Sequence, residues 1–139
     1  MFARLFPIVR NKSNPDESVR DRAGRLFASG LNCAQAVLQS TAGVDDPDLM
    51  AIAKAFGGGV GNSKCLCGAV SGGVMALGLK GKGGKSGELV KLFKEQHSVT
   101  CCSALSRPYQ WKSKEHLANC RKLTEDTAEI VETLLLEND

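Results

Sequence analysis

Residues 64–77 read KCLCGAVSGGVMAL, an apolar run in which Gly68, Gly72 and Gly73 interrupt the larger side chains. We predict a helix here, although each glycine costs about 1 kcal/mol relative to alanine in an isolated helix. Tertiary contacts must offset that cost. Gly68 and Gly72 are four residues apart and lie on one face, where a second backbone can approach closely. We therefore expect this helix at the centre of the fold.

Three helices are predicted before this segment. Residues 14–17, NPDE, supply an N-cap, a proline at the first helical position and acids in the first turn, and Gly30 ends the helix that they begin. Asn32 caps a second helix. Residues 46–47, DP, begin a third helix that extends to about residue 56.

Three more helical segments are predicted after it. One covers residues 88–97, and Thr100 caps a short turn that holds two cysteines. The last helix covers residues 113–136, with one apolar stripe. The members of that stripe are Leu117, Cys120, Leu123, Thr127, Ile130 and Leu134.

Two glycine-rich segments separate the predicted helices. Residues 57–62, GGGVGN, have too little side chain to pack as a regular element, and we interpret them as a flexible connector or a lid over a site. They lack the GK[ST] ending and the preceding strand of a phosphate-binding loop. Residues 81–87 form a second flexible loop. Because no strand pattern competes, the fold class is all-α: a compact multi-helix bundle around the glycine-rich helix.

Length and charge limit the classes of protein to consider. The chain has 139 residues, which suits a loose leader over residues 1–13 and a single helical domain over residues 14–139. The net charge of +3 is mild, and the lysines at 80, 82 and 85 are best explained as a solvated loop, so we expect no nucleic acid partner. The longest apolar stretch has eleven residues, where a membrane span needs about 20.

The six cysteines are the candidate functional residues. Four lie in predicted helices, at positions 33, 67, 102 and 120, and two more, Cys65 and Cys101, lie beside members of that set. We find no export signal and expect a cytoplasmic protein. Thiols are kept reduced in the cytoplasm, so cysteines there indicate metal ligation or transient redox chemistry rather than structural crosslinks.

Most of these thiols fall at predicted helix starts. Cys33 follows Asn32, Cys65 and Cys67 follow residues 62–63, and Cys101 and Cys102 follow Thr100. The positive end of a helix lowers the pKa of a nearby thiol. We therefore predict lowered pKa values for these cysteines. Cys120 lies in the middle of the last helix, where burial raises the pKa, and is either an inert core residue or a resolving thiol.

Metal ligation is the alternative chemistry. Cys65 and Cys67 are spaced to supply two ligands, but a structural zinc site usually has two close pairs. His97 and His116 are further candidate ligands or bases. Because each is a single histidine on a charged helix, we expect both to lie at the surface.

Four segments together resemble a known family. They are NCAQAV at residues 32–37, CGAVSG at residues 67–72, CSAL at residues 102–105, and Cys120. The set is similar to the C_GCAxxG_C_C family, small bacterial and archaeal proteins described as redox-active, over about residues 16–135.

This resemblance implies a helical domain whose shared cysteines are Cys33, Cys67, Cys102 and Cys120, with Cys65 and Cys101 as extras. His97 stands where such proteins often carry a glycine ahead of the third cysteine.

Three functions follow as hypotheses. The first is a cytoplasmic thiol redox protein in which Cys33 or Cys67 attacks and a second shared cysteine resolves the mixed disulfide. Its partner would be another oxidoreductase or an electron carrier, docking on the glycine-rich loops or the N-terminal segment. In the second, the four shared cysteines ligate zinc or an iron–sulfur cluster. The third is a non-catalytic helical interaction module.

Overall fold

The computed structural model describes residues 15–138, which form seven α-helices and one 3-10 helix. The only extended pairing in this part of the chain is a single antiparallel bridge between Leu66 and Cys101. The prediction of an all-α fold is confirmed. The elements are α1 (Val19–Ala28), α2 (Cys33–Ala42), α3 (Pro47–Lys54), α4 (Gly68–Leu79), η1 (Gly83–Lys85), α5 (Ser86–His97), α6 (Cys102–Ser106) and α7 (Lys114–Leu136).

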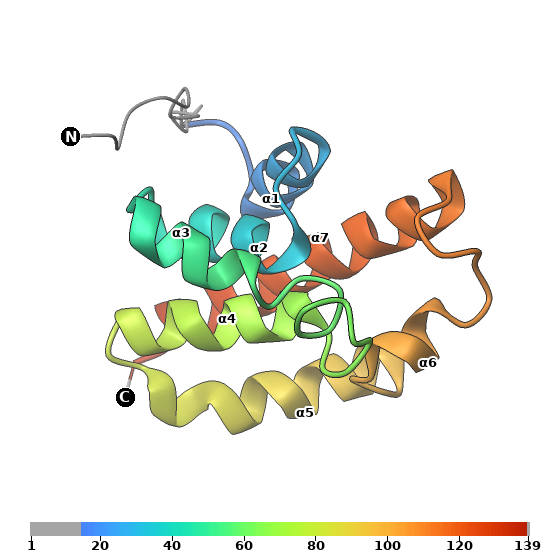
Figure 1. The fold of residues 1–139 in the computed structure, drawn as a ribbon. Helices are drawn as coiled ribbons and strands as arrows, with labels where there is room; N and C mark the ends of the chain where they lie inside the picture. Colours follow the sequence, from blue (N-terminus) through green and yellow to red (C-terminus); the bar gives the residue numbers. More distant parts are fainter. Residues whose placement is uncertain (1–14, 139) are drawn as a thin grey trace.

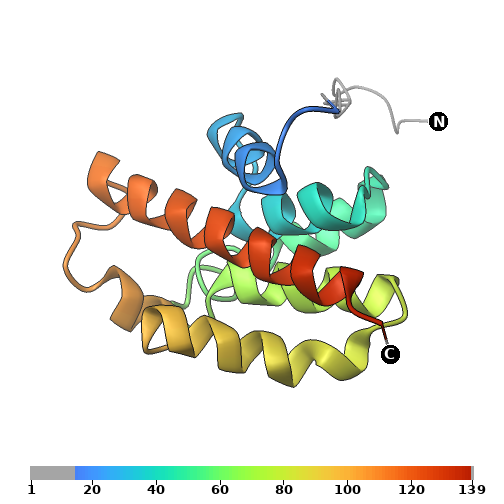
Figure 2. The same ribbon diagram turned by 180° about the vertical axis from the view of Figure 1, so that it is seen from behind.

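Helix α4 is the central element, as predicted. It packs against α2 on one side and α5 on the other, and the long helix α7 crosses behind it (Figures 1 and 2). Val37 of α2, Val70 of α4, Phe93 of α5 and Val131 of α7 are all fully buried in one apolar cluster. The glycine-rich helix therefore forms because three other helices cover it.

Gly68 and Gly72 allow α2 to approach α4 closely, which confirms the expected close contact. A Cβ atom at Gly72 would collide with the backbone carbonyl of Ala34 on α2. A Cβ atom at Gly68 would collide with the sulfur of Cys33. The α2–α4 contact thus depends on two positions that tolerate no side chain, and it brings the first turn of α2 against the start of α4.

Gly72→Ala is expected to destabilise the protein by about 1–3 kcal/mol, because the added methyl group must push α2 and α4 apart. Gly78→Ala is the matched control on the same helix, since nothing lies within 4 Å of the point that its Cβ atom would occupy. This control should gain about 0.5–1 kcal/mol from the higher helix propensity of alanine. Urea unfolding of both variants measures the two changes. Equal effects in the two variants would contradict the close α2–α4 contact.

Several predicted boundaries are wrong. Helix α1 begins at Val19 with Ser18 as its cap, where the side chain accepts from the Asp21 amide at 3.0 Å. The predicted start at residues 14–17 is therefore incorrect, and Asn14 itself, like the leader over residues 1–13, lies outside the described residues. Helix α4 begins at Gly68 rather than Lys64, because the residues before it pair with the segment around Cys101.

The predicted cap at Thr100 and the flexible loop over residues 81–87 also need correction. Cys101 is the N-cap of α6, and its side chain makes no capping hydrogen bond. The loop contains η1, and α5 already begins at Ser86. Leu117 is 47% exposed, so the apolar stripe of α7 is buried from Leu123 onward.

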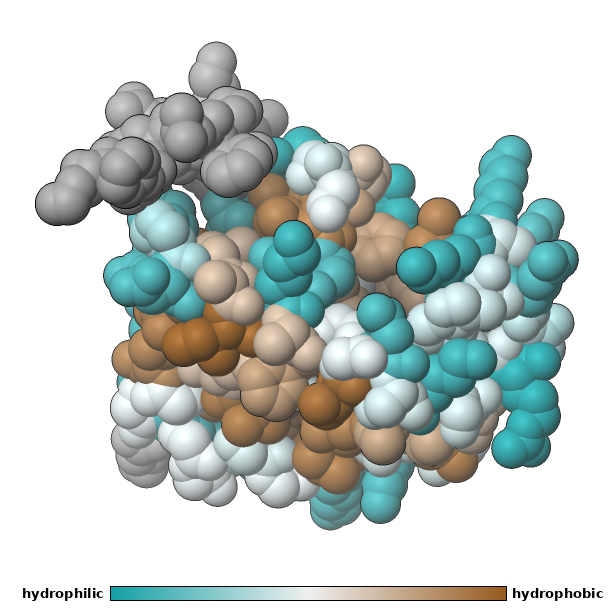
Figure 3. Space-filling view, viewed as in Figure 1, coloured by the Kyte–Doolittle hydropathy of each residue, from teal (hydrophilic) through white to brown (hydrophobic). Residues whose placement is uncertain are grey.

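The face drawn in Figure 3 carries apolar side chains between α3 and α4 and polar side chains along the connection from α6 to α7. Ile52 of α3 and Val74 of α4 are among the exposed large apolar residues. Within residues 15–138 no helix combines the length and the apolar character that crossing a membrane requires.

Candidate functional site

The four shared cysteines line one cavity of about 650 Å³. Cys33 is the first residue of α2, Cys67 is the N-cap of α4, Cys102 is the first residue of α6, and Cys120 lies in α7. None of the six cysteines forms a disulfide. Thiols that are far apart in the sequence thus open onto the same space.

Cys33 and Cys102 each interact electrostatically with the other three thiols of this set, so that a negative charge on one would raise the pKa of the others. Such coupling requires the sulfurs to lie near one another across a medium of low dielectric constant.

Local hydrogen bonds fix the first turn of α2. Asn32 and Gln35 form a capping box in which each side chain accepts from the other residue's amide, both at 3.0 Å. The Asn32 side-chain amide also donates to the Lys54 carbonyl at 2.9 Å. The predicted cap at Asn32 is confirmed, and it anchors Cys33 against the end of α3.

The other thiols are held by pairing between two loops. The Cys67 amide donates to the Thr100 carbonyl at 2.8 Å, and the Cys102 amide donates to the Cys65 carbonyl at 2.5 Å. Together with the bridge between Leu66 and Cys101, these bonds join the segment before α4 to the segment before α6. Cys67 and Cys102 therefore reach the cavity as one hydrogen-bonded unit.

The glycine-rich segment at residues 57–62 forms a wall of the cavity, to which Gly58 and Asn62 contribute. Every residue from 58 to 62 has a positive φ, which is costly for the two that are not glycine. A Cβ atom at Gly59 would lie 2.8 Å from the Cβ of Cys102. Backbone hydrogen bonds hold the segment, among them Cys65 to Gly59 at 2.8 Å. It is a hydrogen-bonded loop beside the cavity, which agrees with the interpretation of this segment as a cover of a site, and its flexibility stays a prediction.

Burial raises the thiol pKa values at this site. This is the largest effect on Cys33, Cys67, Cys102 and Cys120, and it raises the pKa of Cys120 to about 12. The amides of Ala69 and Val70 favour a Cys67 thiolate, as expected at a helix start, but they do not offset burial. The prediction of lowered pKa values for Cys33, Cys67 and Cys102 is therefore wrong.

Stability is expected to fall above about pH 9 because of these thiols. The ordinary thiol pKa is 9.0, so Cys67 ionises near that pH in the unfolded chain but stays protonated in the fold. The unfolded state then binds fewer protons, and the free energy of unfolding falls by up to about 1.4 kcal/mol per pH unit for a fully buried thiol. The contribution of partly exposed Cys120 is smaller. Below about pH 8 these thiols do not make the free energy of unfolding depend on pH.

Urea unfolding between pH 8 and 10.5 under reducing conditions measures this slope. Cys67→Ala removes one titrating thiol and should fall less steeply with pH than the wild type. Parallel curves for the two proteins would show that the Cys67 thiol ionises alike in both states.

The two extra cysteines lie outside the cavity. Cys101 is exposed, and its pKa is lowered, first by the Ser103 hydroxyl at 3.0 Å and then by the amides of Ala104 and Ser103. Cys65 is also exposed and accepts a hydrogen bond from the Ser63 hydroxyl at 3.4 Å. Neither side chain lines the cavity.

His116, a candidate ligand or base from the sequence, belongs to this site. It was expected at the surface, but it is 3% exposed and lines the cavity. Its Nε2 lies 3.4 Å from the Cys120 sulfur and 3.2 Å from the Ser106 hydroxyl, which in turn lies 3.9 Å from the Cys102 sulfur. The spacing of four residues between His116 and Cys120 on one helix was the available signal.

The tautomer of His116 follows from its other nitrogen. Nδ1 accepts the Lys112 amide hydrogen at 2.9 Å, so the ring proton of neutral His116 lies on Nε2. Burial, and then the charge of Lys64, lower the pKa of His116 and keep it neutral. The Nε2 hydrogen therefore points toward Cys120 and Ser106 as a donor, so His116 stabilises charge on sulfur rather than removing a thiol proton.

His116→Ala should cost about 2–4 kcal/mol, because it leaves the Lys112 amide without its acceptor and removes the ring packed against Trp111, whose centroid is 4.4 Å away. His116→Asn offers an amide oxygen in place of Nδ1 and should lose clearly less. Urea unfolding of the two variants compares them. Equal losses would show that the Nδ1 hydrogen bond does not fix this side chain.

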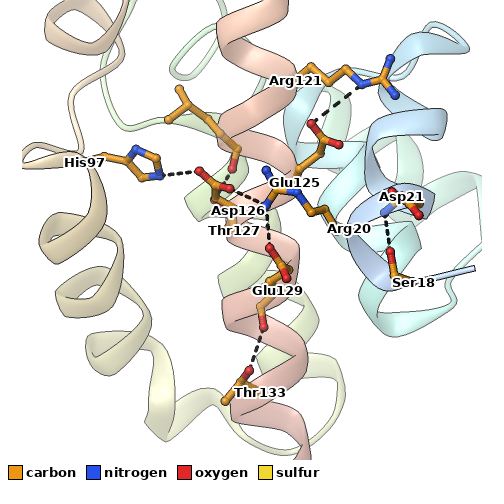
Figure 4. Close-up of polar contacts among 11 residues, drawn as sticks. Ser18, Arg20, Asp21, His97, Arg121, Glu125, Asp126, Thr127, Glu129 and Thr133 are labelled. Carbon is orange, nitrogen blue, oxygen red and sulfur yellow. Dashed lines mark hydrogen bonds and ion pairs between the residues drawn. The ribbon is translucent and has the colours of Figure 1, made fainter.

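His97 lies elsewhere, in a cluster of charged residues between three helices. Its Nε2 on α5 faces Asp126 of α7 at 3.2 Å, and Arg20 of α1 contacts Asp126 at 2.5 Å and Glu129 at 2.6 Å (Figure 4). Burial lowers the pKa of His97, against the opposing effect of Asp126. His97 thus takes part in a network that joins α5, α7 and α1, and it does not line the cysteine cavity.

The candidate ligand side chains are not arranged as a metal site. Within the described part of the chain, no group of three or more His, Cys, Asp or Glu side chains is arranged to hold a metal ion. The raised pKa values of the four cavity thiols keep them protonated at neutral pH, so metal binding would release their protons. Zinc or an iron–sulfur cluster would require these side chains to rearrange and to lose their protons.

Comparison with known proteins identifies the family. A family model described as "Putative redox-active protein (C_GCAxxG_C_C)" matches residues 31–134, which contain all six cysteines. Comparison with the curated proteins and with the solved structures gives no match. The matched residues make up most of the sequence, and the resemblance inferred from the cysteine segments is confirmed. The chain belongs to the C_GCAxxG_C_C family.

Proposed function

We propose that this protein is a cytoplasmic thiol–disulfide exchange protein whose reactive centre is the set of four shared cysteines. One observation carries the proposal: Cys33, Cys67, Cys102 and Cys120 come from four helices, line one cavity and are unpaired. Neighbouring thiols that share an accessible space suit the exchange of one disulfide for another. Membership of a family described as redox-active supports the same chemistry.

Cys33 is proposed as the attacking thiol. Cys33 and Cys102 both interact with the other three thiols, but Cys33 is partly exposed, whereas Cys67 and Cys102 are buried. The amides of Gly58 and Ala34 favour the Cys33 thiolate. Although burial still raises its pKa, a thiolate of high pKa is the stronger nucleophile once formed. Exchange is therefore expected to accelerate as the pH rises above neutrality.

Cys67 is proposed as the resolving thiol, because the Cys33 sulfur lies against Gly68, the residue next to Cys67. The Cys33 thiolate attacks one sulfur of a substrate disulfide, forms a mixed disulfide and releases one thiolate, which takes up a proton. Cys67 loses its proton and attacks the Cys33 sulfur, which releases the second substrate thiolate. Two protein thiols are thus oxidised to one disulfide, and the substrate disulfide is reduced to two thiols.

A second protein must restore the reduced form. We propose a dithiol oxidoreductase, or an electron carrier that delivers two electrons, as this partner. The raised pKa values support a centre that donates electrons, because low-pKa thiols make strong oxidants by stabilising their reduced form and these thiols lack that stabilisation.

Counting thiols under native conditions tests this function. The variant Cys65→Ser/Cys101→Ser retains only the four cavity thiols, and it is incubated without oxygen with 2-hydroxyethyl disulfide, a small uncharged disulfide. The free thiol count should fall from four to two and return to four after treatment with a dithiol reductant. Four thiols that remain free throughout, although denaturation makes all of them react, would overturn the proposal.

A further inference from the structure

The charged residues that line the cysteine cavity are all cationic. They are Lys112, Lys114 and Arg121, and no aspartate or glutamate is among the lining residues in the described part of the chain. Arg121 forms an ion pair with Glu125, whose carboxylate oxygen is 3.9 Å from its Nε. The two lysines therefore supply most of the excess positive charge. The net charge of the whole chain is only +3, so this gathering of positive charge is local.

A fourth cation lies beside the cavity. The ammonium group of Lys64 is 4.6 Å from the ring centroid of Trp111, which lines the cavity. Burial raises the pKa of Cys102 and lowers that of His116, and the charge of Lys64 acts to lower both, so Lys64 lies close enough to influence the cavity thiols. A negative group inside the cavity would therefore meet positive charge from several directions.

The remaining wall is mainly apolar. Phe27 and Leu31 line it near α1, and Leu117 and Trp111 line it near α7. A volume of about 650 Å³ lies within the range of about 300–1,000 Å³ typical of small-molecule sites. The space thus offers apolar surface, cationic groups and thiols to one small ligand.

We propose that the cavity binds a low-molecular-weight disulfide that carries carboxylates. This inference rests on the proposed function and names its substrate class. The carboxylates pair with Lys112 and Lys114, the apolar part packs against Trp111 and Leu117, and one sulfur meets Cys33. The exchange consumes the disulfide, oxidises two protein thiols and releases two anionic thiols. The same lysines stabilise the departing thiolates as they form.

Three disulfide probes of different charge test this assignment in the Cys65→Ser/Cys101→Ser variant. They are oxidised glutathione, which is anionic, 2-hydroxyethyl disulfide, which is neutral, and cystamine, which is cationic. At low ionic strength, oxidised glutathione should react fastest and cystamine slowest, and added salt should narrow the difference. Stopped samples analysed by mass spectrometry give the rate for each probe.

Charge-removing variants identify which residues are responsible. Lys112→Gln/Lys114→Gln should slow the reaction with oxidised glutathione by about tenfold and leave that with 2-hydroxyethyl disulfide nearly unchanged. Lys80→Gln/Lys91→Gln removes the same charge from exposed residues that do not line the cavity, and it should have little effect on either probe.

Each outcome has a distinct meaning. If all three probes react at similar rates, or if the two double variants behave alike, the anionic substrate class is wrong while the exchange function stands. If only a protein disulfide oxidises the centre, the cavity receives a polypeptide segment and the small-molecule assignment is wrong. If nothing oxidises the cavity thiols, the exchange function itself fails.

Discussion

Cys33→Ser is expected to slow oxidation of the cavity thiols by small disulfides at least about a hundredfold, because the loss of a nucleophile removes the covalent step itself. The structural reason is the position of Cys33, which is partly exposed, lines the cavity and interacts with each of the other three thiols. Serine is close in size and should leave the first turn of α2 and its Asn32 cap intact.

Cys120→Ser is the matched control for this result, since Cys120 lines the same cavity and is also partly exposed. Its first exchange step should stay within a few-fold of the wild-type rate. Both variants belong in the Cys65→Ser/Cys101→Ser background. If Cys33→Ser reacts at the wild-type rate while Cys120→Ser does not, Cys120 on α7 is the attacking thiol and the role proposed for Cys33 is wrong.

The second large effect is a difference in alkylation rate between Cys101 and the cavity thiols. At pH 7 a thiol with the pKa of Cys120, about 12, is ionised in about one molecule in 10⁵. An ordinary pKa of 9.0 gives about one in 10², and the pKa of Cys101 lies below that value. Iodoacetamide should therefore label Cys101 at least about 30-fold faster than Cys120, because the stronger nucleophilicity of a high-pKa thiolate offsets only part of this difference in ionisation.

The pH dependence separates the two thiols further. The labelling rate of Cys120 should rise about tenfold per pH unit up to its pKa, whereas that of Cys101 should level off below pH 9. Peptide mass spectrometry of samples stopped at timed intervals follows each cysteine. In denaturant all six rates should converge. Fast labelling of Cys120 in the native protein at pH 7 would show that its thiol is not held protonated by burial.

Features that depend on neighbouring residues could be predicted from the sequence. The Asn32 cap lies within one turn of α2, and the last helix was predicted over residues 113–136, within one residue of the start of α7. The close approach at Gly68 and Gly72 could be inferred because a helix with so many glycines needs outside support. The four shared cysteines could be recognised because each lies in a short, specific pattern.

Features that depend on contacts between residues far apart in the sequence could not be predicted. A helix start lowers a thiol pKa through a few amides nearby, and the sequence shows those amides at Cys33 and Cys67. Burial is a property of the assembled fold, and at these positions it outweighs the amides. His116 is buried because the loop before α7 brings Trp111 and the Lys112 amide onto its ring. No short sequence pattern predicts the conformation of that loop.

Mapping the disulfide that forms on mild oxidation shows whether thiols of the cavity react with one another. The wild-type chain is oxidised with 2-hydroxyethyl disulfide at pH 8, its remaining thiols are blocked, and peptide mass spectrometry locates the crosslink. We expect an intramolecular bond between Cys33 and Cys67. A crosslink confined to the exposed pair Cys65 and Cys101, or to bonds between two chains, with all four cavity thiols still reduced, would contradict this expectation.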